Sequence, residues 1–208
     1  MKQAVVSNRP VQETTESSEW TVEVAQLWPP RGQWTETDYF TLPDTSRFLE
    51  LSEGELIMPP HPTDTHQRVV LNLVRMFDDF VTEQNRGTVR FAPLPVRLWP
   101  GKIREPDLLF VSNEHADRIG EQAYGPPDLV VEVLSQSTWH TDRLEKMAEY
   151  ARAGVREYWI VDPEGHTVEV FVLRQGAYEV LGKWSKGEEA HSEVLTGLKV
   201  AVDEVMER

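Results

Sequence analysis

Residues 104–111 read Arg-Glu-Pro-Asp-Leu-Leu-Phe-Val, and residues 128–134 read Asp-Leu-Val-Val-Glu-Val-Leu. Short runs this rich in Val and Leu predict strands that are buried on both faces of a sheet. Each run includes an acid, Asp107 in the first and Glu132 in the second. Burying an unpaired charge costs at least several kcal/mol, and a divalent cation is the usual compensation. The two stretches therefore predict neighbouring strands whose acids bind Mg²⁺ or Mn²⁺.

The composition limits the class of protein. The chain has 208 residues, 39% of them hydrophobic, which is enough for one good core. We expect a partly mobile N-terminal polar arm at residues 1–32 and a single domain at residues 33–208. The chain has no cysteine, which excludes disulfides, thiolate zinc sites and cysteine nucleophiles and suits a reducing cytoplasm. No apolar stretch is long enough for a membrane span or a signal core, so we expect a soluble cytoplasmic protein with no membrane partner.

The net charge of −14 bears on the choice of partner. An acidic protein is repelled by nucleic acid at long range, and DNA-binding proteins usually carry a basic surface. A nucleic-acid substrate therefore requires a local basic patch or a bound metal ion. A small phosphate ester would require no extended basic surface.

Periodicity and turn residues predict a mixture of helices and strands. Helices are expected at residues 35–42, with Thr35 as the cap, at residues 64–86 and at residues 141–153. Strands are expected at residues 48–58 (two strands around a Glu-Gly turn), 88–98, 104–111, 128–134, 155–161, 167–173, 178–181 and 193–200. This order predicts the α/β (α+β) class, a mixed sheet flanked by helices with β-rich additions.

The sequence also assigns faces to two of the helices. For residues 64–86, with Asp64 as the cap and Gly87 as the end, the expected core stripe is Val69, Val70, Leu73, Val74, Phe77, Phe80 and Val81. For residues 141–153 the expected buried stripe is Leu144, Met147, Ala148 and Ala151.

A polar face on the second of these helices offers a catalytic cation. Asp142, Lys146 and Tyr150 recur at every fourth position and share that face. Lys146 can stabilise the negative charge that develops during hydrolysis of a phosphate ester. The alternative is that Lys146 only pairs with Asp142 or Glu149 along its helix.

The spacing of these residues resembles a known family. The matching residues are Pro106-Asp107, Glu132-Val133-Leu134-Ser135, Asp142, Lys146, Tyr150 and the run Gly154-Val155-Arg156-Glu157-Tyr158-Trp159-Ile160-Val161-Asp162-Pro163. Together they resemble the Uma-two family of restriction endonucleases, in the PD-(D/E)XK nuclease superfamily. The similarity extends from about Gln33 to about Tyr178. Its more specific parts are the Glu-Val-Leu-Ser run and the Tyr-Trp-Ile-Val-Asp-Pro run.

This resemblance implies a restriction-endonuclease-like αβββαβ core and a metal-dependent endonuclease that acts on DNA as a homodimer. It implies Mg²⁺ or Mn²⁺ bound by Asp107 and Glu132, with Glu55 as an additional acid at the metal. His66 also matches a family position near the start of the core.

The chain departs from the superfamily pattern at one position. The usual lysine two residues after the glutamate is replaced by Leu134. Lys146 is the natural substitute, because the resemblance places a lysine of the family at this position, and Asp142 and Tyr150 would support it. The expected catalytic set is therefore Asp107, Glu132 and Lys146.

Each candidate residue also has a structural interpretation. Asp107 can cap a turn, and Asp128, at the start of the second strand, competes with it as a ligand. Glu132 is harder to explain in this way, because a turn does not account for an acid within a strand. His66 can be a structural hydrogen-bonding group, and Glu55 an ordinary exposed strand residue.

Two other functions stay open beside the nuclease. A non-catalytic binding or assembly module on the same fold is favoured by Leu134 and by the acidic charge. A metal-dependent hydrolase of a smaller phosphate ester is compatible with the same carboxylates.

Overall fold

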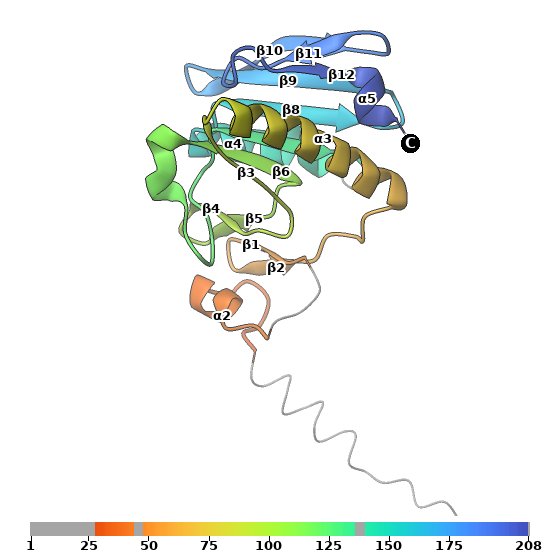
Figure 1. The fold of residues 1–208 in the computed structure, drawn as a ribbon. Coiled ribbons are helices and arrows are strands. Elements are labelled where there is room, and N and C mark those ends of the chain that lie inside the picture. Colours follow the sequence, from red (N-terminus) through yellow and green to blue (C-terminus); the bar gives the residue numbers. More distant parts are fainter. Residues whose placement is uncertain (1–27, 44–47, 136–139, 208) are drawn as a thin grey trace, which may run out of the picture.

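The computed structural model describes residues 28–43, 48–135 and 140–207; residues 1–27 of the arm predicted at residues 1–32 lie outside this part. A six-stranded sheet in the order β10-β9-β8-β7-β6-β3 forms the centre (Figure 1). Its strands are β3 (Gly87–Phe91), β6 (Leu108–Ser112), β7 (Leu129–Val133), β8 (Glu157–Asp162), β9 (Thr167–Arg174) and β10 (Ala177–Trp184). Strands β7 and β8 are parallel, and the other neighbours in this sheet are antiparallel. The predicted mixed sheet is therefore confirmed.

Two smaller sheets accompany the central one. The first, in the order β2-β1-β5-β4, comprises β1 (Glu50–Ser52), β2 (Glu55–Ile57), β4 (Val96–Trp99) and β5 (Lys102–Arg104). The second comprises β11 (Glu189–His191) and β12 (Lys199–Ala201). The helices are α2 (Glu36–Phe40), α3 (Asp64–Glu83), the 3₁₀-helical η1 (Asn113–Arg118), the π-helical η2 (Thr141–Lys146), α4 (Met147–Ala153) and α5 (Val202–Met206).

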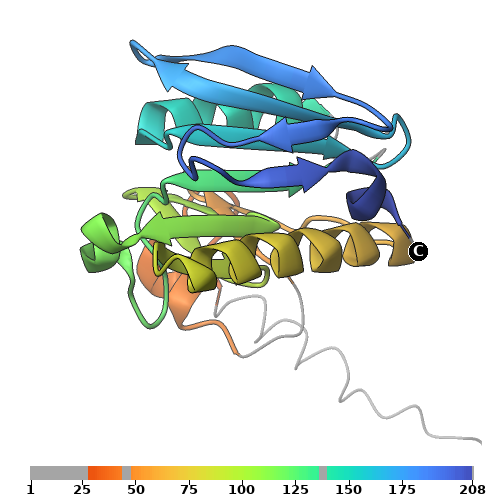
Figure 2. The same cartoon turned by 45° about the horizontal axis from the view of Figure 1, so that its top comes forward.

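The helices cover the central sheet on both faces (Figures 1 and 2). On one face, the predicted stripe of α3 packs on the sheet, and Phe77 meets Trp159 edge-on at 5.3 Å between ring centroids. On the other face, Tyr150 of α4 lies against Tyr158 of β8. The order α3-β3-β6-β7-α4-β8 matches the expected αβββαβ core, with β4 and β5 inserted between its first two strands.

The start of α3 differs in detail from the prediction. The cap is Thr63 rather than Asp64, because the Thr63 side chain accepts a hydrogen bond from the His66 backbone N–H at 3.2 Å. The helix ends at Glu83, and Gly87 instead begins β3. A side chain at Gly87 would collide with the Val111 carbonyl oxygen, so the close pairing of β3 with β6 requires glycine there.

Two predicted strands are each divided between two sheets. Residues 88–98 form β3 in the central sheet and β4 in the smaller one, and residues 104–111 contribute the end of β5 and most of β6 in the same way. Prolines lie at both breaks, Pro93 and Pro95 in the first and Pro106 in the second. Proline has no N–H group for a sheet ladder, so the chain leaves one sheet at each of these points.

A buried acid joins the C-terminal part to the central sheet. Glu157, at the start of β8, is fully buried and accepts hydrogen bonds from the Ser192 hydroxyl at 2.6 Å and the Val194 backbone N–H at 2.9 Å. It also accepts one from the Trp159 indole at 2.6 Å. These bonds satisfy the carboxylate and hold the connection between β11 and β12 in place.

The packing of α3 generates a stability prediction. Leu73 is fully buried in the core, whereas Leu71, two residues earlier on the same helix, is 47% exposed. Leu73→Ala should lower the free energy of unfolding by about 2–5 kcal/mol through the cavity it leaves. Leu71→Ala, the matched control, should change it by no more than about 0.5 kcal/mol. Denaturant unfolding measures both, and equal losses would show that α3 packs through a different face.

Candidate active site

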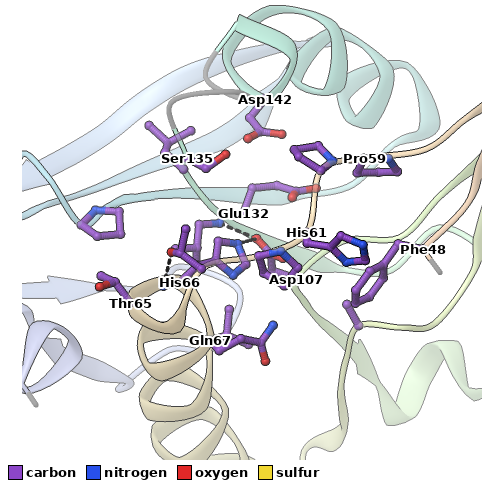
Figure 3. A pocket seen from close by; sticks show the side chains of 18 of the residues that line it. Phe48, Pro59, His61, Thr65, His66, Gln67, Asp107, Glu132, Ser135 and Asp142 are labelled. Atoms are coloured by element: carbon purple, nitrogen blue, oxygen red, sulfur yellow. Dashed lines mark hydrogen bonds and ion pairs between the residues drawn. The ribbon is translucent and has the colours of Figure 1, made fainter. Parts of the chain in front are cut away.

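A cavity of about 910 Å³ opens where the four-stranded sheet, the first turn of α3 and the ends of β6 and β7 meet (Figure 3). Its lining is rich in carboxylates, contributed by Glu50, Glu105, Asp107, Glu132, Asp142, Asp162 and Glu164. Lys146 is the one lysine or arginine among the described lining residues, and two histidines, His61 and His66, accompany it. The cavity is therefore strongly acidic.

Asp107 and Glu132 line the same cavity. The last pair in the antiparallel register of β6 and β7 is Leu108 with Val131, and Asp107 and Glu132 are the next residues beyond this pair on the two segments. The side chain of Asp107 is fixed to strand β7, because its Oδ2 accepts a hydrogen bond from the Val133 backbone N–H at 2.7 Å. The structure thus brings together the two acids from which a metal site was predicted.

Glu132 is buried and held by two donors. Its Oε2 lies 2.9 Å from Lys146 Nζ, and its Oε1 accepts a hydrogen bond from the Tyr150 hydroxyl at 2.7 Å. Burial raises the pKa of Glu132 well above its ordinary value; Lys146 opposes this rise, and the nearby Asp142 adds to it. A cation beside these acids is required to keep them ionised.

Helix η2 supplies that cation. The buried residues of η2 and α4 are Asp142, Lys146 and Tyr150, whereas Leu144 is 56% exposed and Ala148 is exposed too. The predicted apolar stripe is therefore wrong at Leu144 and Ala148, because the polar face lies inward; Met147, another member of that stripe, is partly buried against the core. Lys146 Nζ is 3.1 Å from Asp142 Oδ1 and 4.0 Å from Glu50 Oε1, in addition to its pair with Glu132. Ion pairs thus offset the cost of turning this face towards the sheet.

Lys146 is held in its charged form. Burial by itself would lower the pKa of the ammonium, but the carboxylates of Glu132, Glu50 and Asp142 outweigh burial and raise the pKa well above its ordinary value. Lys146 is therefore a fixed positive charge at neutral pH and is unsuited to the role of general base.

His66 contacts Asp107 from α3. Its Nε2 lies 3.2 Å from Asp107 Oδ2, and both residues line the cavity (Figure 3). Burial by itself lowers the pKa of His66. The hydrogen bond to Asp107 and the charge of Asp107 raise the pKa by more than burial lowers it, so the pKa lies above its ordinary value. The cap at Thr63 fixes the first turn of α3 and thereby the position of this imidazole.

Glu55 is not brought to the cavity. It lies on β2, its side chain is 42% exposed, and it forms a two-point ion pair with Arg31 at 3.0 and 2.9 Å. Glu50, on the neighbouring strand β1, lines the cavity in its place. Glu50 is an acid within the apolar run Phe48-Leu49-Glu50-Leu51, the same signal that identified Glu132, so the sequence offered a means to find it.

Glu105 is a second acid that the sequence prediction missed. It directly precedes Pro106 and Asp107, its Oε1 accepts a hydrogen bond from the Tyr39 hydroxyl at 3.3 Å, and it lines the cavity. Burial raises the pKa of Glu105 to about 7, with a further contribution from the charge of Glu50. No spacing rule separates this acid from an ordinary surface glutamate.

Asp128 has a structural role at the opposite end of β7. It is fully buried and accepts hydrogen bonds from the Ser112 backbone N–H at 2.8 Å and from His115 Nδ1 at 2.7 Å. It is not among the cavity residues. It therefore does not compete with Asp107.

The donor chemistry of the cavity fits a hard divalent cation. Carboxylate oxygens are the ligands that Mg²⁺ and Mn²⁺ prefer. Three buried polar atoms of lining residues have no hydrogen-bond partner, namely His66 Nδ1, Glu105 Oε2 and Asp142 Oδ1, although the last is ion-paired with Lys146. As placed, no three His, Asp or Glu side chains of the described residues converge closely enough to hold an ion. Metal binding would therefore require rearrangement of side chains in the cavity.

Comparison with known proteins shows the family and the fold. Residues 36–203 match the family described as "Uma2: Putative restriction endonuclease", which is most of the chain. The chain belongs to the Uma2 family. A solved structure from Anabaena variabilis ATCC 29413, described as a "putative nuclease belonging to DUF820", has the same fold, with a TM-score of 0.69 and 21% identity over 83% of this chain and 97% of that one. A comparison with curated proteins gave no significant match.

Leu134 shows how this Uma2 protein departs from the superfamily pattern. Its side chain is buried with Tyr150 and Tyr158, and its backbone N–H donates to the Val161 carbonyl at 2.8 Å. The usual position of the lysine is thus part of the core. Lys146 instead supplies an ammonium group to Glu132 from the following helix.

A buried ion network connects helix α4 of the Uma2 protein to the four-stranded sheet. Glu149 accepts hydrogen bonds from Arg104 at 2.7 and 2.9 Å and from Lys102 at 2.7 Å. Arg104 also donates to Glu50 Oε2 at 2.6 Å. Glu149 lies one turn after Lys146, so the network fixes the segment that carries the ammonium against the strand that carries Glu50.

This network generates a pH-dependent prediction. Burial raises the pKa of Glu149, but its bonds to Arg104 and Lys102 outweigh burial and lower the pKa below its ordinary value. Its stabilisation is therefore complete above the unfolded-state pKa of about 4.3 and is lost as pH falls through the lower folded-state pKa. Glu149→Gln should lower the free energy of unfolding at pH 7 by about 3–5 kcal/mol, with a smaller difference below pH 4.

Glu145→Gln is the matched control for Glu149→Gln, because Glu145 is exposed on the preceding turn. It should change the free energy of unfolding by no more than about 0.5 kcal/mol at either pH. Denaturant unfolding at pH 7 and pH 3.5 measures both variants. A pH-independent loss in Glu149→Gln would show that packing, rather than charge, is responsible.

Proposed function

We propose that this Uma2 protein is a metal-dependent nuclease that hydrolyses phosphodiester bonds in DNA, with Asp107 and Glu132 as ligands of Mg²⁺ or Mn²⁺. The observation that carries the proposal is that these two acids line one cavity, with Lys146 Nζ 2.9 Å from Glu132. The family and the nuclease-like fold support the same reaction class.

The residues divide the chemistry between them. In hydrolysis, a water oxygen forms a bond to phosphorus while the bond from phosphorus to one sugar oxygen breaks, and that sugar oxygen takes a proton. A bound divalent cation would polarise the phosphoryl oxygen and lower the pKa of a water molecule. Lys146 contributes a fixed positive charge against the negative charge that develops on the phosphoryl group. His66 orients Asp107, and Tyr150 orients Glu132.

Hydrolysis of a smaller phosphate ester is the second candidate function. Seven carboxylates and one lysine line the cavity, so the described lining lacks the basic surface that normally binds nucleic-acid phosphates. This observation favours a substrate with a single phosphate group. A homodimer and a cytoplasmic location stay predictions, and sedimentation of the purified protein would test the first.

Cleavage assays with matched variants test the proposed nuclease. Wild-type protein should cleave oligonucleotides or plasmid in Mg²⁺ or Mn²⁺ and lose this activity with a chelator. Asp107→Asn and Glu132→Gln should each lower the rate roughly 100-fold or more, since even outer-shell partners of metal sites contribute about 10- to 100-fold. Asp117→Asn, at an exposed position outside the cavity, is the control.

The outcomes of the cleavage assay separate the candidates. Turnover of a model phosphodiester without cleavage of any nucleic acid would favour the smaller ester. Absence of both activities in either metal would favour a non-catalytic module on the nuclease-like fold.

Glu50, rather than Glu55, is the further acid that we assign to the metal site, and metal-dependent stabilisation tests this assignment. A ligand that binds only the folded state raises its stability by RT ln(1 + [L]/Kd). The melting temperature is measured in chelator and then in Mn²⁺ at concentrations that increase in 10-fold steps. The rise caused by Mn²⁺ should be preserved in Glu55→Gln and reduced in Glu50→Gln. Each variant serves as its own baseline, so a lower starting stability of Glu50→Gln does not affect the comparison. Loss of the rise in Glu55→Gln alone would reverse the assignment.

A further inference from the structure

The reactive groups lie below the molecular surface, which limits how a substrate can reach them. The side chains of Glu132 and Asp142 are almost completely buried, and Lys146 and Asp107 are only slightly exposed. A phosphodiester must therefore enter the cavity to meet them. Duplex DNA is stiff over tens of base pairs, so a flexible single strand can bring its backbone to a recessed site more easily than a duplex can.

The cavity also offers little charge with which to bind phosphates. Lys146 is its one described lysine or arginine, and ion pairs with Glu132 and Asp142 already engage it. Within the cavity, further binding energy must come from contacts that carry no charge. Stacking of bases on aromatic rings supplies such energy and does not depend on sequence.

Two aromatic side chains, Phe48 and Phe91, line the cavity together with its acids. Phe91 is 53% exposed and lines the cavity; it pairs with Leu108 at the end of β3, and the next residue, Ala92, donates its N–H to the Asp107 carbonyl at 3.2 Å. Phe48 precedes Glu50 by two residues and projects into the same cavity (Figure 3). The two phenylalanines thus add aromatic surface to a cavity that is otherwise lined mainly by acids.

We propose that the substrate is unpaired nucleic acid: a single-stranded segment whose phosphodiester enters the cavity while neighbouring bases lie against Phe91 and Phe48. This inference rests on the proposed nuclease function and specifies its substrate class. The prolines of the Pro59-Pro60-His61-Pro62 loop add apolar surface on the same rim. The acidic lining repels all phosphates, and a duplex carries twice the charge of a single strand per unit length, so the lining opposes paired DNA more strongly than unpaired DNA.

Binding by a cleavage-deficient variant tests the inference without metal. Full-length Glu132→Gln is titrated with a fluorescent single-stranded oligonucleotide, the same strand in a duplex, and the same strand with abasic positions. The single strand should bind at least 10-fold more tightly than the other two. The logarithm of its affinity should fall against the logarithm of salt concentration with a slope of only about −1, as for one or two phosphate contacts.

Substitutions on the rim identify the surface responsible. Phe91→Ala and Phe48→Ala, each combined with Glu132→Gln, should weaken single-strand binding about 5- to 150-fold per lost stacked base. Leu181→Ala, which removes an exposed apolar side chain from β10 outside the cavity, should leave the affinity unchanged. Circular dichroism of each variant confirms that it is folded.

Cleavage of the same oligonucleotides by wild-type protein separates this inference from the nuclease proposal. Duplex bound and cleaved as well as single strand, or tight binding of the abasic strand, would overturn the inference and leave the nuclease intact. Absence of cleavage in Mg²⁺ and Mn²⁺ would overturn the nuclease, and the inference with it. Faster cleavage of the single strand that depends on Phe91 would support both.

Discussion

The ammonium group of Lys146 lies among the carboxylates of Glu132, Asp142 and Glu50, and the arrangement of the cavity depends on it. Three acids buried together without a cation would be protonated or would prevent folding. With Lys146 present, η2 can turn its polar face to the sheet and β7 can carry an acid in its interior. The same contact positions a charge where hydrolysis of a phosphate ester would require one, so the ion pair serves both the fold and the site.

The sequence is most informative where a charged residue lies within or beside an apolar segment. An acid inside an apolar run predicts Glu132, and Asp107 lies beside a similar run; both line the cavity. Glu50 also lies inside an apolar run, whereas the family resemblance points to Glu55. The fold class followed from the order of periodic segments, which local hydrophobicity is sufficient to define.

Hydrophobicity could not reveal features that depend on partners distant in sequence. Hydrophobicity predicts Leu144 and Ala148 for the buried stripe of their helix. Lys146 lies inward instead, because it forms ion pairs with acids of β7 and β1. The division of residues 88–98 and 104–111 between two sheets also depends on which strands pair. Prolines marked the breaks without indicating that the chain changes sheet there.

A buried acid lies at each end of strand β7: Asp128 directly precedes the strand, and Glu132 is its second-last residue. Asp128 is satisfied by Ser112 and His115, outside the cavity lining, while Glu132 is satisfied from η2 and α4. Glu157 secures the C-terminal strands through bonds of its own. The scaffold thus has two anchors, at Asp128 and Glu157, that do not involve the cavity. Loss of Glu132 would leave both anchors in place but would deprive the buried Lys146 of a partner, so a change at this one position would disturb the fold and the candidate site together.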